Sequence, residues 1–261
     1  MSEPRHILVS GGTSGINRGI AERFASRGDN VSVFSRKQDK VDDTVAALKR
    51  LGSAAFGTTA DVRDAEAVTG AIGACVEAQG EIDVLISGAA GNFLAPAAAM
   101  SSNAFGSVVG IDLQGSFNVA RAAFEHLKKP GSCLIQISAP QAYVPMLMQS
   151  HVCAAKAGVD MLTRTLALEW GSMGIRVNSI VPGAVDGTEG MKRLLTNPAM
   201  KDKLTETIPL GRLSHPGDCA DVAEFLASPQ GQYITGVILP VDGGWSLAGA
   251  SLMQHMMMQG G

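Results

Sequence analysis

The chain has 261 residues, of which 46% are hydrophobic and 17% are charged, and it contains 31 glycines. This composition is typical of a compact protein with many tight turns, and it excludes the disordered and fibrous classes. The formal net charge of -3, without any block rich in lysine or arginine, argues against nucleic acid as a partner. No apolar run approaches the ~20 residues of a membrane span, so we expect no membrane partner.

The four cysteines and five histidines are scattered along the chain. They lack the spacing of a metal site or of a disulfide framework, so we expect no metal. The first residues, MSEPRHILVS, and the last, QGG, carry no recognisable targeting signal. A cytoplasmic location is therefore expected.

Seven short, β-rich apolar runs predict strands at 6–10, 31–35, 54–60, 83–87, 133–138, 175–181 and 237–241. Between them, apolar residues three and four apart predict amphipathic helices. This alternation predicts a Rossmann-type, doubly wound α/β fold, with a seven-stranded parallel sheet covered by helices on both faces. No linker or internal repeat divides the chain, so we expect residues 1–261 to form a single domain.

A glycine-rich turn, GGTSGIN, joins the first predicted strand to the first predicted helix. Glycines at such a junction let the backbone approach a pyrophosphate, and the N-terminus of the helix offers unpaired N–H groups. We therefore predict that the phosphates of a dinucleotide bind at Gly11, Thr13, Ser14, Gly15 and Ile16.

The second predicted strand ends in FSRKQDK, where an acidic residue would hydrogen-bond the adenosine ribose of NAD. Arg36 and Lys37 instead suit a 2′-phosphate, so the expected cofactor is NADPH (NADP). A solvated basic turn is the alternative explanation of these residues. Arg18, in the first helix, is expected to add to the same pocket.

Residues 184–215 interrupt the alternation with a long polar insertion before the last strand. Such an insertion can cover cofactor and substrate, so we predict a small substrate lid there. An ordinary surface excursion is the alternative. Thr188, at the base of the insertion, is expected to bond the nicotinamide amide or a phosphate.

Taken together, these motifs resemble the short-chain dehydrogenase/reductase family over nearly the whole chain. The family's TGxxxGxG motif is similar to SGGTSGIN (10–17), its NNAG motif to SGAAG (87–91), and its sixth-strand pattern to RVNSIVPG (176–183). The C-terminal GVILPVDGG (236–244) is also typical. The resemblance implies further cofactor contacts at Asp61, Val62, Ala89, Ala90, Gly91, Pro182 and Gly183.

Four positions depart from the family pattern. Most members use a serine, a tyrosine and a lysine, and counting back from Lys156 places the tyrosine at Val152 and the serine at Ala139. Valine neither donates a proton nor stabilises an oxyanion, so ordinary ketone reduction is disfavoured. Asn17 replaces the third glycine of the phosphate loop, and Asp112 replaces the asparagine of the fourth helix.

A narrower resemblance accounts for the missing tyrosine. AAGNFLAPA, IDLQGSFNV, SHVCAAKAGVDMLTRTLALEWG and VPGAVDGTEGMKRLL resemble the 2,4-dienoyl-CoA reductase branch, particularly its peroxisomal type. That branch also lacks the tyrosine and carries an aspartate at the position of Asp112. The resemblance implies NADPH-dependent reduction of a trans-2,4-dienoyl-CoA thioester to a 3-enoyl-CoA.

In this chemistry the hydride adds to the far end of the conjugated thioester and the proton ends on carbon, so a water can deliver it. Lys156 is then expected to supply positive charge and to position the nicotinamide ribose, while Asp112 orients a water or relays a proton. Tyr143 is a third candidate catalytic residue, because its phenol follows the fifth strand. The expected substrate-binding residues are Asn92, Phe93 and His151. Purely structural roles for these side chains are the alternative.

Two other functions stay open. One is reduction of another activated keto or enoyl substrate, such as a 3-oxoacyl thioester or a polyketide. The other is non-catalytic binding of NADP(H) or acyl-CoA, against which Lys156 and Asp112 argue. Long helices expected at 101–129 and 150–173 are apolar on more than one face, which fits the homotetramer usual in the family.

Overall fold

The computed structural model describes residues 4–189, 191 and 198–248. Its centre is a seven-stranded parallel sheet with the strand order β3-β2-β1-β4-β5-β6-β7. The strands are β1 (His6–Ser10), β2 (Asn30–Ser35), β3 (Phe56–Thr59), β4 (Val84–Ser87), β5 (Cys133–Ile137), β6 (Arg176–Pro182) and β7 (Ile238–Val241). The predicted seven-stranded doubly wound fold is confirmed, and each strand lies within two residues of its predicted bounds.

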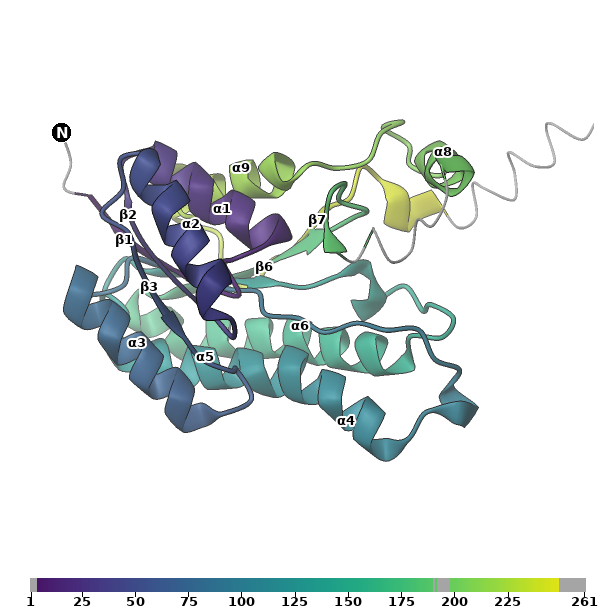
Figure 1. Cartoon of the computed structure of the whole chain (residues 1–261), viewed down its shortest axis with the longest axis horizontal. Helices are drawn as coiled ribbons and strands as arrows, with labels where there is room; N and C mark the ends of the chain where they lie inside the picture. The colour runs from purple at the N-terminus through teal and green to yellow at the C-terminus, as the bar shows by residue number, and fades with distance from the viewer. Residues whose placement is uncertain (1–3, 190, 192–197, 249–261) are drawn as a thin grey trace, which may run out of the picture.

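Helices cover both faces of this sheet (Figure 1). One layer contains α1 (Gly15–Ser26), α2 (Gln38–Arg50) and α9 (Pro216–Leu226). The opposite layer contains α3 (Ala65–Gln79), α4 (Ser102–Val109), α5 (Gly115–Ala123) and α6 (Ser150–Trp170). A further helix, α8 (Pro198–Glu206), lies between β6 and α9 in the chain. Short 3-10 turns occupy Ala97–Ala99, Phe124–His126, Pro140–Ala142, Gly171–Met173, Pro229–Gly231 and Trp245–Leu247.

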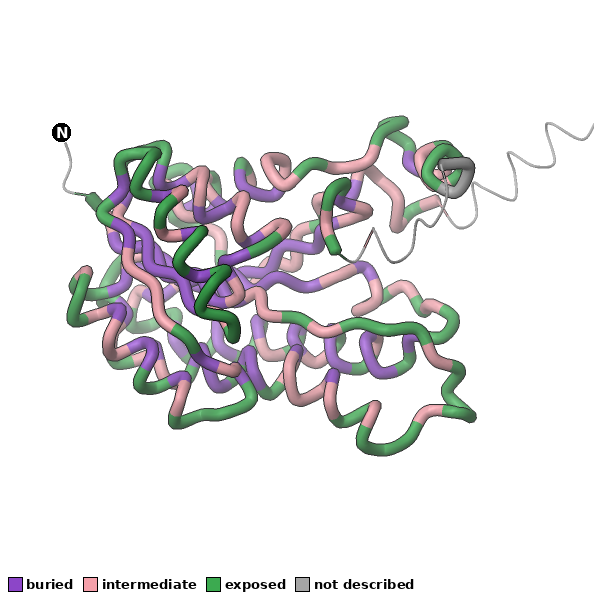
Figure 2. Tube along the Cα trace, in the orientation of Figure 1, coloured by how far each residue is buried: buried purple, intermediate pink, exposed green. Residues whose placement is uncertain are grey.

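The sheet separates two buried apolar clusters, and successive strand residues alternate between them because side chains of a strand point to opposite faces. Leu8 and Leu134 join the cluster with residues of α3, α5 and α6. Ile7 and Ile135 join the cluster with residues of α1 and α9. Figure 2 shows this burial concentrated along the strands and the inner sides of the helices. A parallel sheet buried on both faces explains why the strands read as nearly continuous apolar runs.

The strand order places the ligand crevice. The chain runs from β1 outward to β2 and β3, and then returns to β4 on the other side of β1. The connections after β1 and β4 therefore leave the sheet in opposite directions, which opens a crevice at their carboxyl ends. Ser10 and Ser87, the last residues of these two neighbouring strands, lie side by side in the register.

The long helix predicted at 101–129 is not one regular helix. A π-helical turn, η2 (Gly110–Gln114), separates α4 from α5, and the helical segment ends with the 3-10 turn at His126. The backbone angles beside the turn stay helical, so the pattern of apolar residues does not reveal it. Asp112 lies in the middle of this wide turn, as residues at functional sites often do. The helix predicted at 150–173 is confirmed as α6 followed by a 3-10 turn.

The two ends of the segment predicted as a lid, 184–215, lie side by side. Val185 pairs with Ser214 in an isolated parallel bridge, and the N–H of Asp186 donates to the carbonyl oxygen of Ser214 at 2.8 Å. These bonds close the base of the segment beside the end of β6. Positions 190 and 192–197 of the predicted lid lie outside the described residues.

Candidate active site

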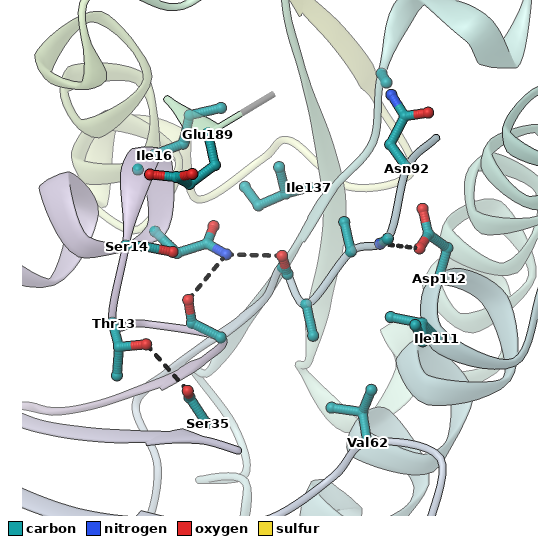
Figure 3. Close-up of a pocket in the computed structure, with 18 of the residues that line it drawn as sticks. Thr13, Ser14, Ile16, Ser35, Val62, Asn92, Ile111, Asp112, Ile137 and Glu189 are labelled. Atoms are coloured by element: carbon teal, nitrogen blue, oxygen red, sulfur yellow. Dashed lines mark hydrogen bonds between the residues drawn. The ribbon is translucent and has the colours of Figure 1, made fainter. Parts of the chain in front are cut away.

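A cavity of about 380 Å³ opens at the carboxyl ends of the central strands (Figure 3). Its walls come from the loop after β1, the ends of β2 and β3, the loop after β4, the end of β5 and one side of α6. The cavity therefore occupies the crevice that the strand order creates.

Most of the predicted cofactor residues line this cavity: Gly11, Thr13, Ser14, Gly15, Ile16, Arg36, Asp61, Val62, Ala89, Ala90, Gly91, Lys156 and Thr188. Pro182 and Gly183 are not in the lining. Pro182 is the buried last residue of β6, and a Cβ on Gly183 would lie 2.7 Å from the Cα of Asp242. Close packing against the segment after β7 therefore accounts for the glycine at 183.

The loop after β1 forms a cradle at the N-terminus of α1. Gly11 and Gly15 have φ values of +68° and +55°, which favour glycine, and a Cβ on Gly11 would lie 3.0 Å from the backbone of Ala89. The side chain of Ser14, the residue before α1, makes no capping hydrogen bond, and no acidic residue lies in the first turn. The unpaired N–H groups of α1 and its positive end therefore fit a pyrophosphate.

The ends of β2 and β3 form the opposite side of the cradle. The Thr13 hydroxyl donates to Ser35 Oγ at 3.0 Å (Figure 3). Arg36, the next residue after Ser35, is exposed and also lines the cavity. A side-chain hydrogen bond from Arg63 lowers the pKa of Asp61 to about 2, so this carboxylate stays ionised at neutral pH. Both charges flank the place where the fold puts the adenosine ribose.

Arg18 does not contribute to this cavity. Its guanidinium pairs with Glu22 at 2.8 Å and with Asp43 at 2.7 Å, and the residue lines a separate surface groove between α1 and α9. The expectation that Arg18 joins the cofactor pocket is therefore wrong, because two carboxylates hold it on the outer side of α1.

The wall of the cavity contains a buried ion pair, Asp112 and Lys156. Lys156 Nζ lies 3.4 Å from Asp112 Oδ2 and donates to the carbonyl oxygen of Ile137 at 2.9 Å. Asp112 Oδ1 accepts a hydrogen bond from the N–H of Gly91 at 2.7 Å (Figure 3). The side chains of the pair are only 1% and 6% exposed. The pair thus ties α6, the π-helical turn and the loop after β4 to one point.

No tyrosine lines the cavity among the described residues, and Val152 stands one helical turn before Lys156. Tyr143 is 46% exposed, and its hydroxyl donates to Ser246 Oγ at 3.4 Å. Burial raises its pKa, so the phenol is a weaker acid than usual. The predicted catalytic role of Tyr143 has no support in this arrangement, because the loop after β5 turns the ring toward the segment after β7.

The three predicted substrate residues separate into two groups. Asn92 lines the cavity, whereas Phe93 and His151 lie outside the lining. Their rings are in contact, with centroids 4.3 Å apart. His151 is fully buried and neither ring nitrogen has a hydrogen-bond partner within the described residues, while Phe93 is 37% exposed. The pair adjoins Val152 and Asn92 in sequence, at the edge of the cavity.

Behind Lys156, one turn further along α6, lies the buried carboxyl of Asp160. Ser179 Oγ of β6 donates to it at 3.5 Å. Desolvation raises the pKa of Asp160, and this rise is partly offset by Ser138, Arg164 and Lys156.

Several lining residues were not predicted as site residues. Ile111, Ile137 and Glu189 line the cavity and are labelled in Figure 3, where Glu189 lies on the same side as Ser14 and Ile16. Ile111 and Glu189 are the direct sequence neighbours of the predicted residues Asp112 and Thr188, and this adjacency is the signal in the sequence that points to them. This wall is completed by Ser138, Ala139 and Gln141 of the segment that follows β5.

The fold and this cavity define an oxidoreductase of the nicotinamide-dependent type, and the chain belongs to the short-chain dehydrogenase/reductase family. The family described as enoyl-(acyl carrier protein) reductase matches residues 11–246. The chain is 40% identical over 247 residues to the peroxisomal 2,4-dienoyl-CoA reductase ((3E)-enoyl-CoA-producing) of Arabidopsis thaliana, covering 91% of this chain and 83% of that protein. It is 42% identical over 245 residues to the corresponding Saccharomyces cerevisiae enzyme, covering 92% and 84%.

Among solved structures, an actinorhodin polyketide ketoreductase variant with NADPH superimposes with a TM-score of 0.88 at 27% identity, covering 94% of this chain and 98% of that one. The resemblance to this family, and to its dienoyl-CoA reductase members, is therefore confirmed.

Within the described ranges, no helix is long and apolar enough to span a membrane. The same residues contain no cluster of three or more histidine, cysteine or acidic side chains that could hold a metal ion. Burial raises the pKa of Cys75 and Cys219 to about 12 and that of Cys133 to about 11. These three thiols are thus poor nucleophiles at neutral pH.

Proposed function

We propose that the chain is an NADPH-dependent 2,4-dienoyl-CoA reductase that yields a 3-enoyl-CoA without a catalytic tyrosine. The observation that carries this proposal is the buried Asp112–Lys156 pair in a cofactor cavity whose described lining contains no phenol. Such a site lacks a proton donor for a ketone oxygen but keeps a positive charge where an enolate oxygen would form. The similarity to two 2,4-dienoyl-CoA reductases supports the same substrate.

The cofactor residues support NADPH in particular. When bound, NADPH supplies a hydride from its nicotinamide ring. Arg36 lines the cavity beside Ser35, at the end of β2, where a 2′-phosphate would meet a guanidinium rather than a carboxylate. The proposed phosphate contacts are the cradle around Gly15, and Thr188 lies next to it, with its Cγ2 3.4 Å from the position of a Cβ on Gly15.

The proposed reaction adds the hydride to C5 of the conjugated thioester. The C4–C5 π electrons form a new double bond between C3 and C4, the C2–C3 π electrons form one between C1 and C2, and the carbonyl π electrons move to the thioester oxygen, which gives a dienolate. A proton from water then adds at C2, which gives the 3-enoyl-CoA and consumes one NADPH and one proton. Lys156 stabilises the negative charge and positions the nicotinamide ribose, while Asp112 holds the ammonium in place and orients the water.

The acyl chain has a defined place in this scheme. Asn92 in the cavity lining is proposed to bond the thioester carbonyl. Phe93, which is partly exposed at the edge of the cavity, is proposed to contact the apolar chain, and the buried ring of His151 packs against Phe93 and supports it from behind. The segment 184–215 is proposed to cover both ligands, since its described base carries Thr188 and Glu189 into the lining.

NADPH oxidation followed by absorbance tests the proposal, with 2,4-hexadienoyl-CoA and 2,4-decadienoyl-CoA measured beside acetoacetyl-CoA. We expect turnover of the dienoyl thioesters only, and product analysis should place the remaining double bond between C3 and C4. Turnover of acetoacetyl-CoA instead would favour the alternative of a 3-oxoacyl or polyketide reductase, which the similarity to the actinorhodin ketoreductase keeps open. NADPH binding without any turnover would favour a non-catalytic protein.

We also propose that the chain forms the homotetramer expected from its sequence. Exposed apolar side chains on α4, α5 and α6, namely Phe105, Phe117, Met161 and Leu168, support it. Sedimentation of the purified chain tests this state directly. A cytoplasmic location stays a prediction, and the Arabidopsis and yeast relatives are named as peroxisomal enzymes.

A further inference from the structure

Asn17, the third residue of α1, places its amide between the two loops that leave the sheet in opposite directions. Asn17 Nδ2 donates to the carbonyl oxygen of Gly88 at 2.7 Å and more weakly to that of Gly11 at 3.4 Å. Gly11 follows β1 and Gly88 follows β4, so the two acceptors flank the crevice. One side chain therefore ties the phosphate loop to the loop after β4.

The same side chain leaves no room for a Cβ at position 88. A Cβ built on Gly88 would lie only 2.6 Å from Asn17 Cγ and closer still to both amide heteroatoms. Gly88 is not a positive-φ glycine, so its backbone conformation does not require glycine. Contact with Asn17 is thus the reason for the glycine, and the two residues form a matched pair.

The family motifs show the opposite arrangement. Against TGxxxGxG, Asn17 stands at a glycine, and against NNAG, Gly88 stands at an asparagine. The amide and the glycine have exchanged places across the crevice, while the volume of the pair is roughly preserved. Asn17 is 8% exposed and lines the cofactor cavity, so this exchange lies within the wall that a dinucleotide would contact.

We infer that Asn17 and Gly88 act as a coupled positioning pair, in which the Asn17 amide sets the separation of the two loops and thereby the affinity for the dinucleotide. This inference rests on the nicotinamide cofactor of the proposed function, but not on the dienoyl substrate. Gly91 lies three residues after Gly88 in the same loop, and its N–H donates to Asp112 Oδ1 at 2.7 Å. A displacement of Gly88 would therefore also displace the Gly91 N–H that binds Asp112.

A double-mutant cycle tests the pair: Asn17→Gly, Gly88→Ala and the double variant, each in the full chain. NADPH affinity is read by fluorescence titration, and stability by urea unfolding without cofactor. We expect each single substitution to weaken NADPH binding roughly tenfold. In the Asn17→Gly background the added methyl of Gly88→Ala enters vacated space, so the second substitution should cost at most roughly twofold.

Asn17→Asp gives a second readout that a merely space-filling residue would not show. At neutral pH a carboxylate would face the carbonyl oxygens of Gly11 and Gly88, so NADPH binding should be weaker than in Asn17→Gly. Protonation restores a donor, so the deficit relative to wild type should shrink as the pH falls. As a control, Asn178→Ala removes another buried amide, which donates to Ile234 outside the cavity at 3.0 Å. It should lower stability while NADPH affinity stays unchanged.

Two results would overturn the inference while leaving the proposed function intact. The first is equal loss of NADPH affinity from Gly88→Ala in both backgrounds. The second is a wild-type affinity in Asn17→Asp at neutral pH. A wild-type chain that binds neither NADPH nor NADH would instead refute the proposed function, and with it the cofactor role of the pair.

Discussion

The buried pair of Asp112 and Lys156 should show a large energetic coupling. Two opposite charges 3.4 Å apart interact by about 5 kcal/mol at the effective dielectric constant of ~20 that describes protein sites. Lys156→Met leaves an almost fully buried carboxylate without its counter-charge, and Asp112→Asn leaves the ammonium with only the Ile137 carbonyl oxygen. Each single variant should therefore lose ~3–5 kcal/mol of unfolding free energy. The double variant should lose at least ~2 kcal/mol less than the sum.

Urea unfolding at one fixed protomer concentration measures this coupling. The exposed pair Asp186 and Lys201, 2.7 Å apart, is a matched control, and its coupling should stay below ~1 kcal/mol because solvent screens it. NADPH oxidation by the same variants tests the chemistry. Asp112→Asn should lower kcat with little change in the KM for NADPH, whereas Lys156→Met should affect both. Losses at 112 and 156 that add within ~0.5 kcal/mol would refute the reasoning.

Three further predictions concern the cofactor, the phenol and pH. Arg36→Asp should raise the KM for NADPH roughly tenfold or more and the KM for NADH far less. An unchanged ratio of these two KM values would show that Arg36 does not bind the 2′-phosphate. Tyr143→Phe should keep kcat within about twofold of wild type, because the hydroxyl donates to Ser246 and does not line the cavity. A large loss of kcat would indicate that the phenol takes part in the reaction. Burial raises the pKa of Asp160, so the folded chain keeps a proton that the unfolded chain has released. Stability from this group is therefore present at low pH and lost as the pH rises through the folded-state pKa. The unfolding free energy of Asp160→Asn, relative to that of wild type, should therefore increase from about pH 4 to about pH 7. Urea unfolding at both pH values measures this difference, and a difference that does not change with pH would contradict the prediction.

Much of the fold was predictable because its physical causes are local. Strands of a parallel sheet are buried on both faces and are therefore largely apolar, so short apolar runs such as that at 6–10 predict where the strands lie. Glycines that approach a phosphate are expected after the first strand, and Gly11 and Gly15, predicted on that ground, line the cavity. Arg36 was predicted because it stands after the second strand, where the ribose-binding residue of the fold is expected, and Asp61 because of the resemblance to the family.

Other features depend on contacts between distant segments. The π-helical turn around Asp112 has helical backbone angles and no signature in the pattern of apolar residues. The direction of Tyr143 is set by the loop after β5, whose short 3-10 turn at Pro140–Ala142 was not predicted. The sequence shows Asn17 only as a replacement of a motif glycine, and its hydrogen-bond partner Gly88, 71 residues away, is known only from the structure.

The π-helical turn at 110–114 also determines which sequence changes this helix can absorb. A wide turn contains one residue more than an α-helical turn would need, and each residue of an α-helix rotates the direction of its side chain by about 100°. Removing one residue of the turn after Asp112 would therefore restore a regular helix in which α4, the aspartate and α5 keep their orientation. Removing one before Asp112 would turn the carboxylate away from Lys156. Length variation among homologues should thus be tolerated on one side of this aspartate and selected against on the other.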